Sequence, residues 1–256
     1  MAQITIDSVA KVFETARKRT VALDQTSLTI DHHETVCVVG PSGCGKTTML
    51  NLIAGFLRPT AGTITLDGRT VGGPAADRAV VFQSDAVFPW LTVADNVGFG
   101  PRMQGMARAV RAERIARFLD LVGLSDFAKA YPKELSGGMR KRVDLARAYA
   151  SGPDVLLLDE PFGALDLFTK ESMWTALKRV ADAEPKTIVF VTHDIEEALF
   201  LGDRVIVMTP RPARVHGIVD VPFGPDRDLD LRADPGFQAL RMTIAHSLRE
   251  VHDDAS

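Results

Sequence analysis

The sequence predicts an α/β fold built around a parallel β-sheet. Three runs of apolar residues, 36–39, 155–158 and 188–191, contain no polar residue, as expected for parallel strands that are buried on both faces. Glycine or polar residues follow each run, and helical spacing of apolar residues resumes further along the chain. Ligand sites of parallel sheets lie at the carboxyl ends of the strands, so the residues after these runs are the first candidates for a functional site.

A glycine-rich turn follows the first run and opens into a helix. It consists of Gly40, Pro41, Ser42, Gly43, Cys44, Gly45, Lys46, Thr47 and Thr48. Glycines let backbone N–H groups face a phosphate that side chains would block, and the helix start adds the positive end of its dipole. Lys46 can reach the terminal phosphates, and the Thr47 hydroxyl can bind Mg²⁺. Because this is the P-loop spacing, we predict a nucleotide site here rather than a plain strand-to-helix turn.

Composition and charge are those of an ordinary globular protein. Hydrophobic residues make up 46% and charged residues 25% of the 256 residues, enough for a sizeable core. The net charge of −3 gives no electrostatic reason to expect nucleic acid or an anionic membrane as a partner. No apolar run approaches the roughly 18 residues of a transmembrane helix, and the first residues lack a signal-peptide pattern. Cys37 and Cys44 are a poor disulfide pair, so we expect a reduced, cytosolic protein.

Polar residues at three strand ends suit nucleotide hydrolysis. Asp159 and Glu160 follow the apolar run 155–158, where Asp159 can hold Mg²⁺ and Glu160 can take a proton from water. Gln83 follows a predicted strand at 79–82 and could contact Mg²⁺ or the attacking water, although an isolated strand-end glutamine is more often simply solvated. His193 ends the strand at 186–192 and is a candidate for contact with the γ-phosphate.

A second glycine-rich helix start lies at residues 135–139. Ser136 is a good N-cap, and Gly137 and Gly138 fall within the first turn of the predicted helix. Each glycine costs about 1 kcal/mol in a helix, so an ordinary capped helix would rarely contain both. The exposed N–H groups and the helix dipole make a second anion site.

The remaining segments predict further subdomains. Apolar and polar residues alternate at Ile4 and Ile6, at residues 21–30 and at residues 62–68, which predicts N-terminal strands. Spacing alone favours Phe13 as a half-buried strand residue over a base-stacking one. Residues 84–153 are predominantly helical, with Phe88 and Trp90 either in a core or on a partner surface. Phe237 and the apolar residues after it form one stripe of a final helix.

Together these motifs resemble the ATP-binding subunits of ABC transporters over nearly the whole chain. Residues 40–48 resemble the Walker A motif, 135–139 the ABC signature, and 155–160 the Walker B motif ending in its catalytic glutamate. Gln83 matches the Q-loop, Asp166 the D-loop and His193 the switch histidine. Phe13 takes the base-stacking position, where the family usually has tyrosine. Lys141 replaces a common glutamine, and we expect at most a modest effect there.

The resemblance implies a P-loop NTPase fold. Its RecA-like parallel core would comprise residues 1–84 and 154–210 and would include an N-terminal antiparallel β subdomain. An inserted α-helical signature subdomain would comprise residues 85–153, and a C-terminal extension with an amphipathic helix residues 211–256. The implied ligands are ATP and Mg²⁺. The implied ATP-binding residues are Phe13, Gly40, Pro41, Ser42, Gly43, Cys44, Gly45, Lys46, Thr47, Thr48, Ser136, Gly137, Gly138 and Asp166. The implied Mg²⁺ ligands are Thr47, Gln83 and Asp159, and the implied catalytic residues are Glu160, His193 and Gln83.

The resemblance also implies partners. Two copies would form a homodimer that holds two ATP molecules between them, and would act on integral membrane permease subunits and, indirectly, on a periplasmic solute-binding protein. No nucleic acid is expected. The protein would be peripheral, on the cytoplasmic face of the inner membrane of a bacterium.

Several segments resemble one group within the family, the nitrate, sulfonate, taurine and bicarbonate importers. They are residues 83–93, 192–198, 211–215 and 230–232. This implies uptake of a small anionic solute. The alternative is a soluble ABC ATPase acting on DNA, translation or Fe–S assembly, although the chain has a single ATPase half and no long coiled coil between Thr48 and Leu135.

Overall fold

The computed structural model describes residues 2–15, 18–84 and 86–253. They divide between two compact units, one drawn from residues 1–75 and 186–256 and the other from residues 76–185. Residue 85, where the predicted helical subdomain begins, lies outside the described residues. The predicted subdomain boundaries stay a prediction.

The first unit contains an antiparallel sheet near the N-terminus. It is formed by β1 (Ile4–Thr15), β2 (Lys18–Ile30), β4 (Ala61–Leu66) and β5 (Arg69–Thr70), in the order β2-β1-β4-β5. Ile4 pairs with Ile30 on one side and Leu66 on the other, and all three side chains are buried. The alternation of apolar residues along β1 therefore gives the sheet its buried face. The predicted N-terminal antiparallel β-sheet is confirmed.

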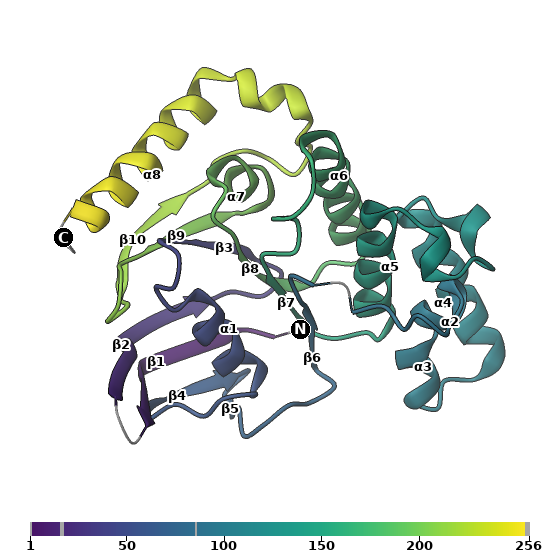
Figure 1. Cartoon of the computed structure of the whole chain (residues 1–256), viewed down its shortest axis with the longest axis horizontal. Coiled ribbons are helices and arrows are strands. Elements are labelled where there is room, and N and C mark those ends of the chain that lie inside the picture. The colour runs from purple at the N-terminus through teal and green to yellow at the C-terminus, as the bar shows by residue number, and fades with distance from the viewer. Residues whose placement is uncertain (1, 16–17, 85, 254–256) are drawn as a thin grey trace. The chain divides into compact units, whose positions relative to one another are not determined.

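Parallel strands form the core of the same unit. β3 (Thr35–Val39) lies between β8 (Thr187–Val191) and β9 (Arg204–Met208) and is parallel to both, whereas β10 (Val215–Asp220) is antiparallel to β9. The apolar runs of β3 and β8 are almost completely buried, which explains why they contain no polar residue. Helices α1 (Lys46–Ala54) and α7 (Ile195–Leu201) follow β3 and β8. A 3₁₀ turn, η3 (Leu229–Ala233), leads into α8 (Pro235–Asp253), which runs beside β10 (Figure 1).

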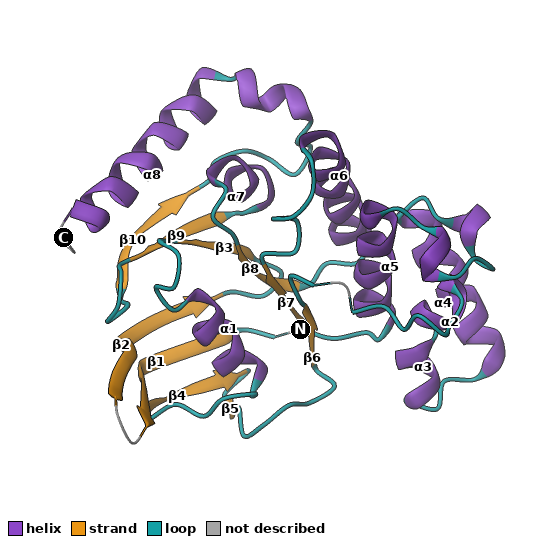
Figure 2. Ribbon diagram, viewed as in Figure 1, coloured by secondary structure: helices purple, strands orange, loops and turns teal. Residues whose placement is uncertain are grey.

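The second unit is mainly helical, as Figure 2 shows. Its described strands are β6 (Arg78–Val81) and β7 (Val155–Asp159), which pair in parallel. Its helices are α2 (Val93–Val97), α3 (Phe99–Met103), α4 (Arg108–Leu121), α5 (Gly137–Ala150) and α6 (Leu167–Ala183), with 3₁₀ turns η1 (Ser125–Phe127) and η2 (Pro132–Glu134). Its largest fully buried side chains among the described residues are Trp174, Tyr149, Phe118 and Phe162. This confirms an α/β fold.

Among the described helices, none is both long and apolar enough to cross a lipid bilayer.

Candidate functional site

The glycine-rich turn forms a tight loop between β3 and α1. Gly43 and Gly45 have positive φ angles of 72° and 131°, which residues with a side chain rarely adopt. A Cβ atom on Gly45 would also lie 3.0 Å from the carbonyl oxygen of Ala22. Position 45 therefore needs glycine for two reasons. Its φ angle disfavours a side chain, and a Cβ atom there would crowd the backbone of β2.

The loop has the features that a polyphosphate needs. Lys46 is 5% exposed, and its Nζ donates hydrogen bonds to the carbonyl oxygens of Gly40, at 2.8 Å, and Pro41, at 3.1 Å. The ammonium group is thus held against the loop backbone. Gly45 is the N-cap of α1 and offers no side-chain cap, so the first-turn N–H groups carry the positive end of the helix dipole. Thr47 is exposed on this first turn. The residues present fit triphosphate and Mg²⁺ binding.

Arg211 and Ala213 lie near this loop, although the sequence alone predicts no role for them in the site. A Cβ atom on Gly43 would lie 3.0 Å from Nη2 of Arg211, so the loop after β9 brings a second cation to the phosphate loop. A backbone hydrogen bond from Ala213 to Ala22 fixes that loop. The sequence linked residues 211–215 to a subgroup only, because no local spacing relates them to Gly43.

Cys44 is buried inside the loop, with 2% of its surface exposed. Burial raises the pKa of its thiol, and the nearby Lys46 ammonium opposes that rise. The thiol is consequently a poor nucleophile at neutral pH.

His193 leaves the same sheet edge as the phosphate loop. β3 and β8 are adjacent and parallel, with Val38 opposite Val191, and the Thr192 N–H donates to the Val38 carbonyl at 3.1 Å. Asp194 then caps α7 by accepting hydrogen bonds from the N–H groups of Glu196 and Glu197. His193 therefore occupies a short connection that is fixed at both ends.

Phe13 lies on β1 in the same unit. The residue is 39% exposed, and Nζ of Lys11 lies 5.2 Å from the ring centre. An accessible aromatic face on a rigid strand is suitable for stacking on a base.

In the second unit, neighbouring strand ends bring Gln83 and the carboxylates to one edge. β6 and β7 are parallel with Val81 opposite Leu158, so Gln83 and the pair Asp159 and Glu160 emerge from the same end. Glu160 has a φ of 45°, in the left-handed region that a non-glycine residue rarely occupies. Such strain costs about 1–3 kcal/mol and is typical of functional positions.

The signature residues begin α5. Ser136 is its N-cap and accepts a hydrogen bond from the Met139 N–H at 3.2 Å. A Cβ on Gly138 would lie 2.4 Å from Cγ2 of Thr169, whereas the nearest atom to one on Gly137 is 3.8 Å away. Gly138 is therefore required by packing between α5 and α6, a reason that the sequence did not reveal.

Asp166 acts as the N-cap of α6. It accepts hydrogen bonds from the Thr169 N–H at 3.1 Å and from the Thr169 hydroxyl at 2.6 Å. The hydroxyl bond is the main reason that its pKa is lowered. Asp166 therefore has a local structural role, and its expected contact with ATP stays a prediction.

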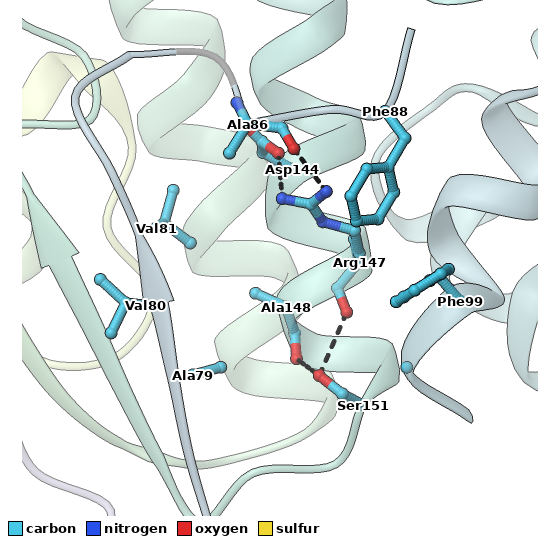
Figure 3. Close-up of a pocket in the computed structure, with 11 residues that line it drawn as sticks. Ala79, Val80, Val81, Ala86, Phe88, Phe99, Asp144, Arg147, Ala148 and Ser151 are labelled. Carbon is cyan, nitrogen blue, oxygen red and sulfur yellow. Dashed lines mark hydrogen bonds and ion pairs between the residues drawn. The ribbon is translucent and has the colours of Figure 1, made fainter. Parts of the chain in front are cut away.

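A cavity of about 270 Å³ lies in the same unit, beside the loop after β6 (Figure 3). It is lined by β6 residues, Ala86, Phe88, Phe99 and one side of α5. The Phe88 ring packs on Phe99, with 4.6 Å between ring centres, and under the Arg147 guanidinium at 5.0 Å. Trp90, next to Phe88, is 71% exposed. Phe88 is thus part of the cavity wall and Trp90 stands on the surface.

The predicted site residues fall into two groups. Phe13, residues 40–48 and His193 lie in the first unit, and Gln83, residues 136–138, Asp159, Glu160 and Asp166 lie in the second.

Comparisons with a family model, with related sequences and with solved structures all point to one family. The family model described as "ABC transporter" matches residues 23–163. The taurine import ATP-binding protein TauB of Rhizobium johnstonii is 48% identical over 98% of both chains, and that of Pelagibacter ubique is 44% identical over 95% of this chain and 94% of its own. The dimeric structure of MJ0796, a bacterial ABC transporter cassette, covers 86% of this chain and 100% of its own with a TM-score of 0.74 and 33% identity. These findings confirm the predicted fold and the predicted importer group.

Proposed function

Because this chain belongs to the ABC transporter family and is the ATPase subunit of an importer, we propose that it drives uptake of a small anionic solute through separate membrane subunits. The observation that carries this proposal is the 48% identity to a taurine import ATP-binding protein over 98% of both chains. Taurine carries a sulfonate group, so a sulfonate is the first solute to test. The choice of solute itself rests with the binding protein and the permease.

The proposed catalytic cycle uses two copies of the chain. ATP binds to residues 40–48 of one copy, with Phe13 stacked on its base, and Ser136, Gly137 and Gly138 of the second copy close over the γ-phosphate. Asp166 lies at this interface in the proposal. Closure of the dimer moves the membrane subunits, and hydrolysis reopens it.

Within one site, each residue has a separate task. Lys46 neutralises charge on the terminal phosphates, and Thr47, Gln83 and Asp159 would hold Mg²⁺. When bound, Mg²⁺ stabilises the negative charge that develops on the phosphate oxygens. Glu160 takes the proton of the attacking water, and His193 contacts the γ-phosphate. The backbone held on either side of His193 and the left-handed backbone of Glu160 support these assignments, because each fixes the point from which the side chain extends.

The cavity beside Phe88 is the proposed docking site of the permease, with exposed Trp90 at its side. A peripheral subunit on the cytoplasmic face of the inner membrane needs such a contact, since none of the described helices can span the bilayer. Aromatic residues near a cavity are typical anchors of a protein interface.

Reconstitution tests the proposal. The chain, co-expressed with its permease subunits and incorporated into vesicles with a solute-binding protein, should support ATP-dependent uptake of labelled taurine or a related sulfonate. Phe88→Ala/Trp90→Ala should lose co-purification with the permease while Phe127→Ala, at another exposed aromatic residue of the same unit, should retain it. Failure of the wild-type chain to bind any membrane subunit would favour a soluble ATPase instead.

A further inference from the structure

One face of α5 holds the loop that follows β6. Lys141, Asp144 and Arg147 are spaced three residues apart and so lie along one side of the helix. Nζ of Lys141 donates to the carbonyl oxygens of Phe82, at 2.9 Å, and Gln83, at 2.8 Å.

The next two side chains of this face hold the loop further along. Asp144 accepts from the Ala86 N–H at 3.0 Å, and Arg147 donates to the Ala86 carbonyl at 2.6 Å and to Asp144 at 2.9 Å. Figure 3 shows Asp144 and Arg147 reaching Ala86 from α5. Both the N–H and the carbonyl group of Ala86 are thereby fixed to the helix.

These charged groups are unusually well buried. Lys141 is 5% exposed and Asp144 2%. Burial of an ammonium or a carboxylate is strongly unfavourable unless hydrogen bonds or an opposite charge compensate it. Here backbone groups of Phe82, Gln83 and Ala86 provide much of that compensation, so the positions of these three residues relative to α5 are tightly specified.

Lysine at position 141 differs from glutamine in ways that matter for these contacts. An ammonium has three donors and a charge, whereas the glutamine amide has two donors and no charge, and its nitrogen is one bond nearer the backbone. Charge-assisted hydrogen bonds are roughly twice as strong as neutral ones. The Lys141 contacts therefore restrain Phe82 and Gln83 more firmly than a glutamine could.

We propose that Lys141 is a positioning residue for ATP hydrolysis. Through its hydrogen bonds to Phe82 and Gln83, it fixes the backbone of Gln83 to the helix that begins at Ser136, and so sets where the Gln83 side chain lies. The inference rests on the proposed role of Gln83 in contacting Mg²⁺ or the attacking water. Lys141 itself touches neither ATP nor Mg²⁺ in this proposal.

A double-mutant cycle on the purified full-length chain tests the inference, with kcat and KM for ATP as readouts. Lys141→Met keeps an unbranched apolar stem as far as Cε but removes the ammonium group, with its donors and charge. It should lower kcat about tenfold and leave KM within about twofold, since a shift of about 1 Å in a positioning group costs up to 10²-fold in rate. Lys133→Met, at an exposed lysine of the same unit, should leave both values unchanged.

The cycle separates positioning from simple stabilisation. In a Gln83→Ala background, Lys141→Met should have no further effect on kcat. Lys141→Gln, which retains two donors, should recover part of the lost rate, and it serves as the test variant if Lys141→Met does not fold. An additive loss of rate in the double mutant would overturn the inference.

The outcomes also distinguish this inference from the proposed site. Wild-type hydrolysis by Gln83→Ala would overturn the role of Gln83 and the inference with it. If Gln83→Ala loses activity but folded Lys141→Met and Lys141→Gln do not, the inference alone is wrong.

Discussion

Replacement of Arg227 by methionine should lower the stability of the unit that contains the phosphate loop. The loss should exceed that caused by replacing an arginine on the surface of the same unit. The Arg227 side chain is 3% exposed, and its guanidinium lies at the C-terminal end of α7. It donates to the carbonyl oxygens of Leu199, Phe200, Gly202, Phe223 and Gly224 at 2.7–3.1 Å. Three of these carbonyls belong to the end of α7, where the helix dipole is negative and unpaired carbonyls gather.

The size of the effect follows from these contacts. Methionine fills similar space but donates nothing, so buried carbonyl oxygens lose their charged donor. A buried acceptor left without its donor costs about 1–3 kcal/mol, so loss of the bonds to Leu199, Phe200 and Gly202 should cost at least about 3 kcal/mol in all. A domain of 150–250 residues changes its melting temperature by roughly 2–4 °C per kcal/mol, so a drop of about 10 °C is expected.

Thermal unfolding followed by circular dichroism measures this drop. Arg241→Met is the matched control, because Arg241 is 39% exposed and its Nε lies 4.0 Å from Glu196. A surface ion pair contributes about 0–1 kcal/mol, so this control should melt within about 3 °C of wild type. Equal melting temperatures for Arg227→Met and wild type would refute the reasoning that Arg227 anchors α7.

Further predictions concern the proposed nucleotide site. Glu160→Gln should lower kcat by about 10²–10⁴-fold while retaining ATP binding and accumulating the closed dimer in size-exclusion chromatography, and near-normal hydrolysis would exclude Glu160 as the base. Lys46→Ala should lose ATP binding in a fluorescent-nucleotide titration, because it removes a phosphate contact of the ground state; retained affinity would contradict this. Thiol reagents should inhibit the ATPase through Cys44 slowly, because the thiol is buried and its pKa is raised, and ATP should protect; full activity after verified labelling would disprove it. Because burial raises the pKa of Cys44, the labelling rate should still be increasing at pH 9, whereas a plateau below pH 8 would contradict the raised pKa.

The sequence was sufficient for features that depend on local pattern. The apolar runs of β3, β7 and β8 predict buried parallel strands, and parallel strands carry their carboxyl ends to one edge. For this reason Gln83 could be expected near Asp159 and Glu160, and the register of β6 and β7 brings their strand ends together. The glycine positions of the phosphate loop are predictable in the same way, since they follow from backbone conformation.

Features that depend on contacts between distant parts of the chain could not be predicted from the sequence. Lys141 donates to the carbonyl oxygen of Gln83, 58 residues away in the sequence, whereas the motif pattern alone predicts at most a modest effect of this lysine. Arg211 lies beside Gly43 only because the loop after β9 pairs with β2. Arg227 looks like one of many charged residues in a polar segment until the end of α7 is packed against it. None of these contacts leaves a periodic signal.

The two signature glycines show how the structure changes the interpretation of a motif. Because both residues are unfavourable in a helix, Gly137 and Gly138 together predict an anion site from the sequence alone. A methyl group at Gly138 would collide with Thr169, so loss of activity in Gly138→Ala could come from displaced packing alone. A methyl group at Gly137 meets nothing closer than 3.8 Å within its surroundings. A substitution at Gly137 therefore tests the proposed approach of phosphate to the helix start without disturbing the packing of α5. Loss of activity in a folded Gly137→Ala variant would support that approach.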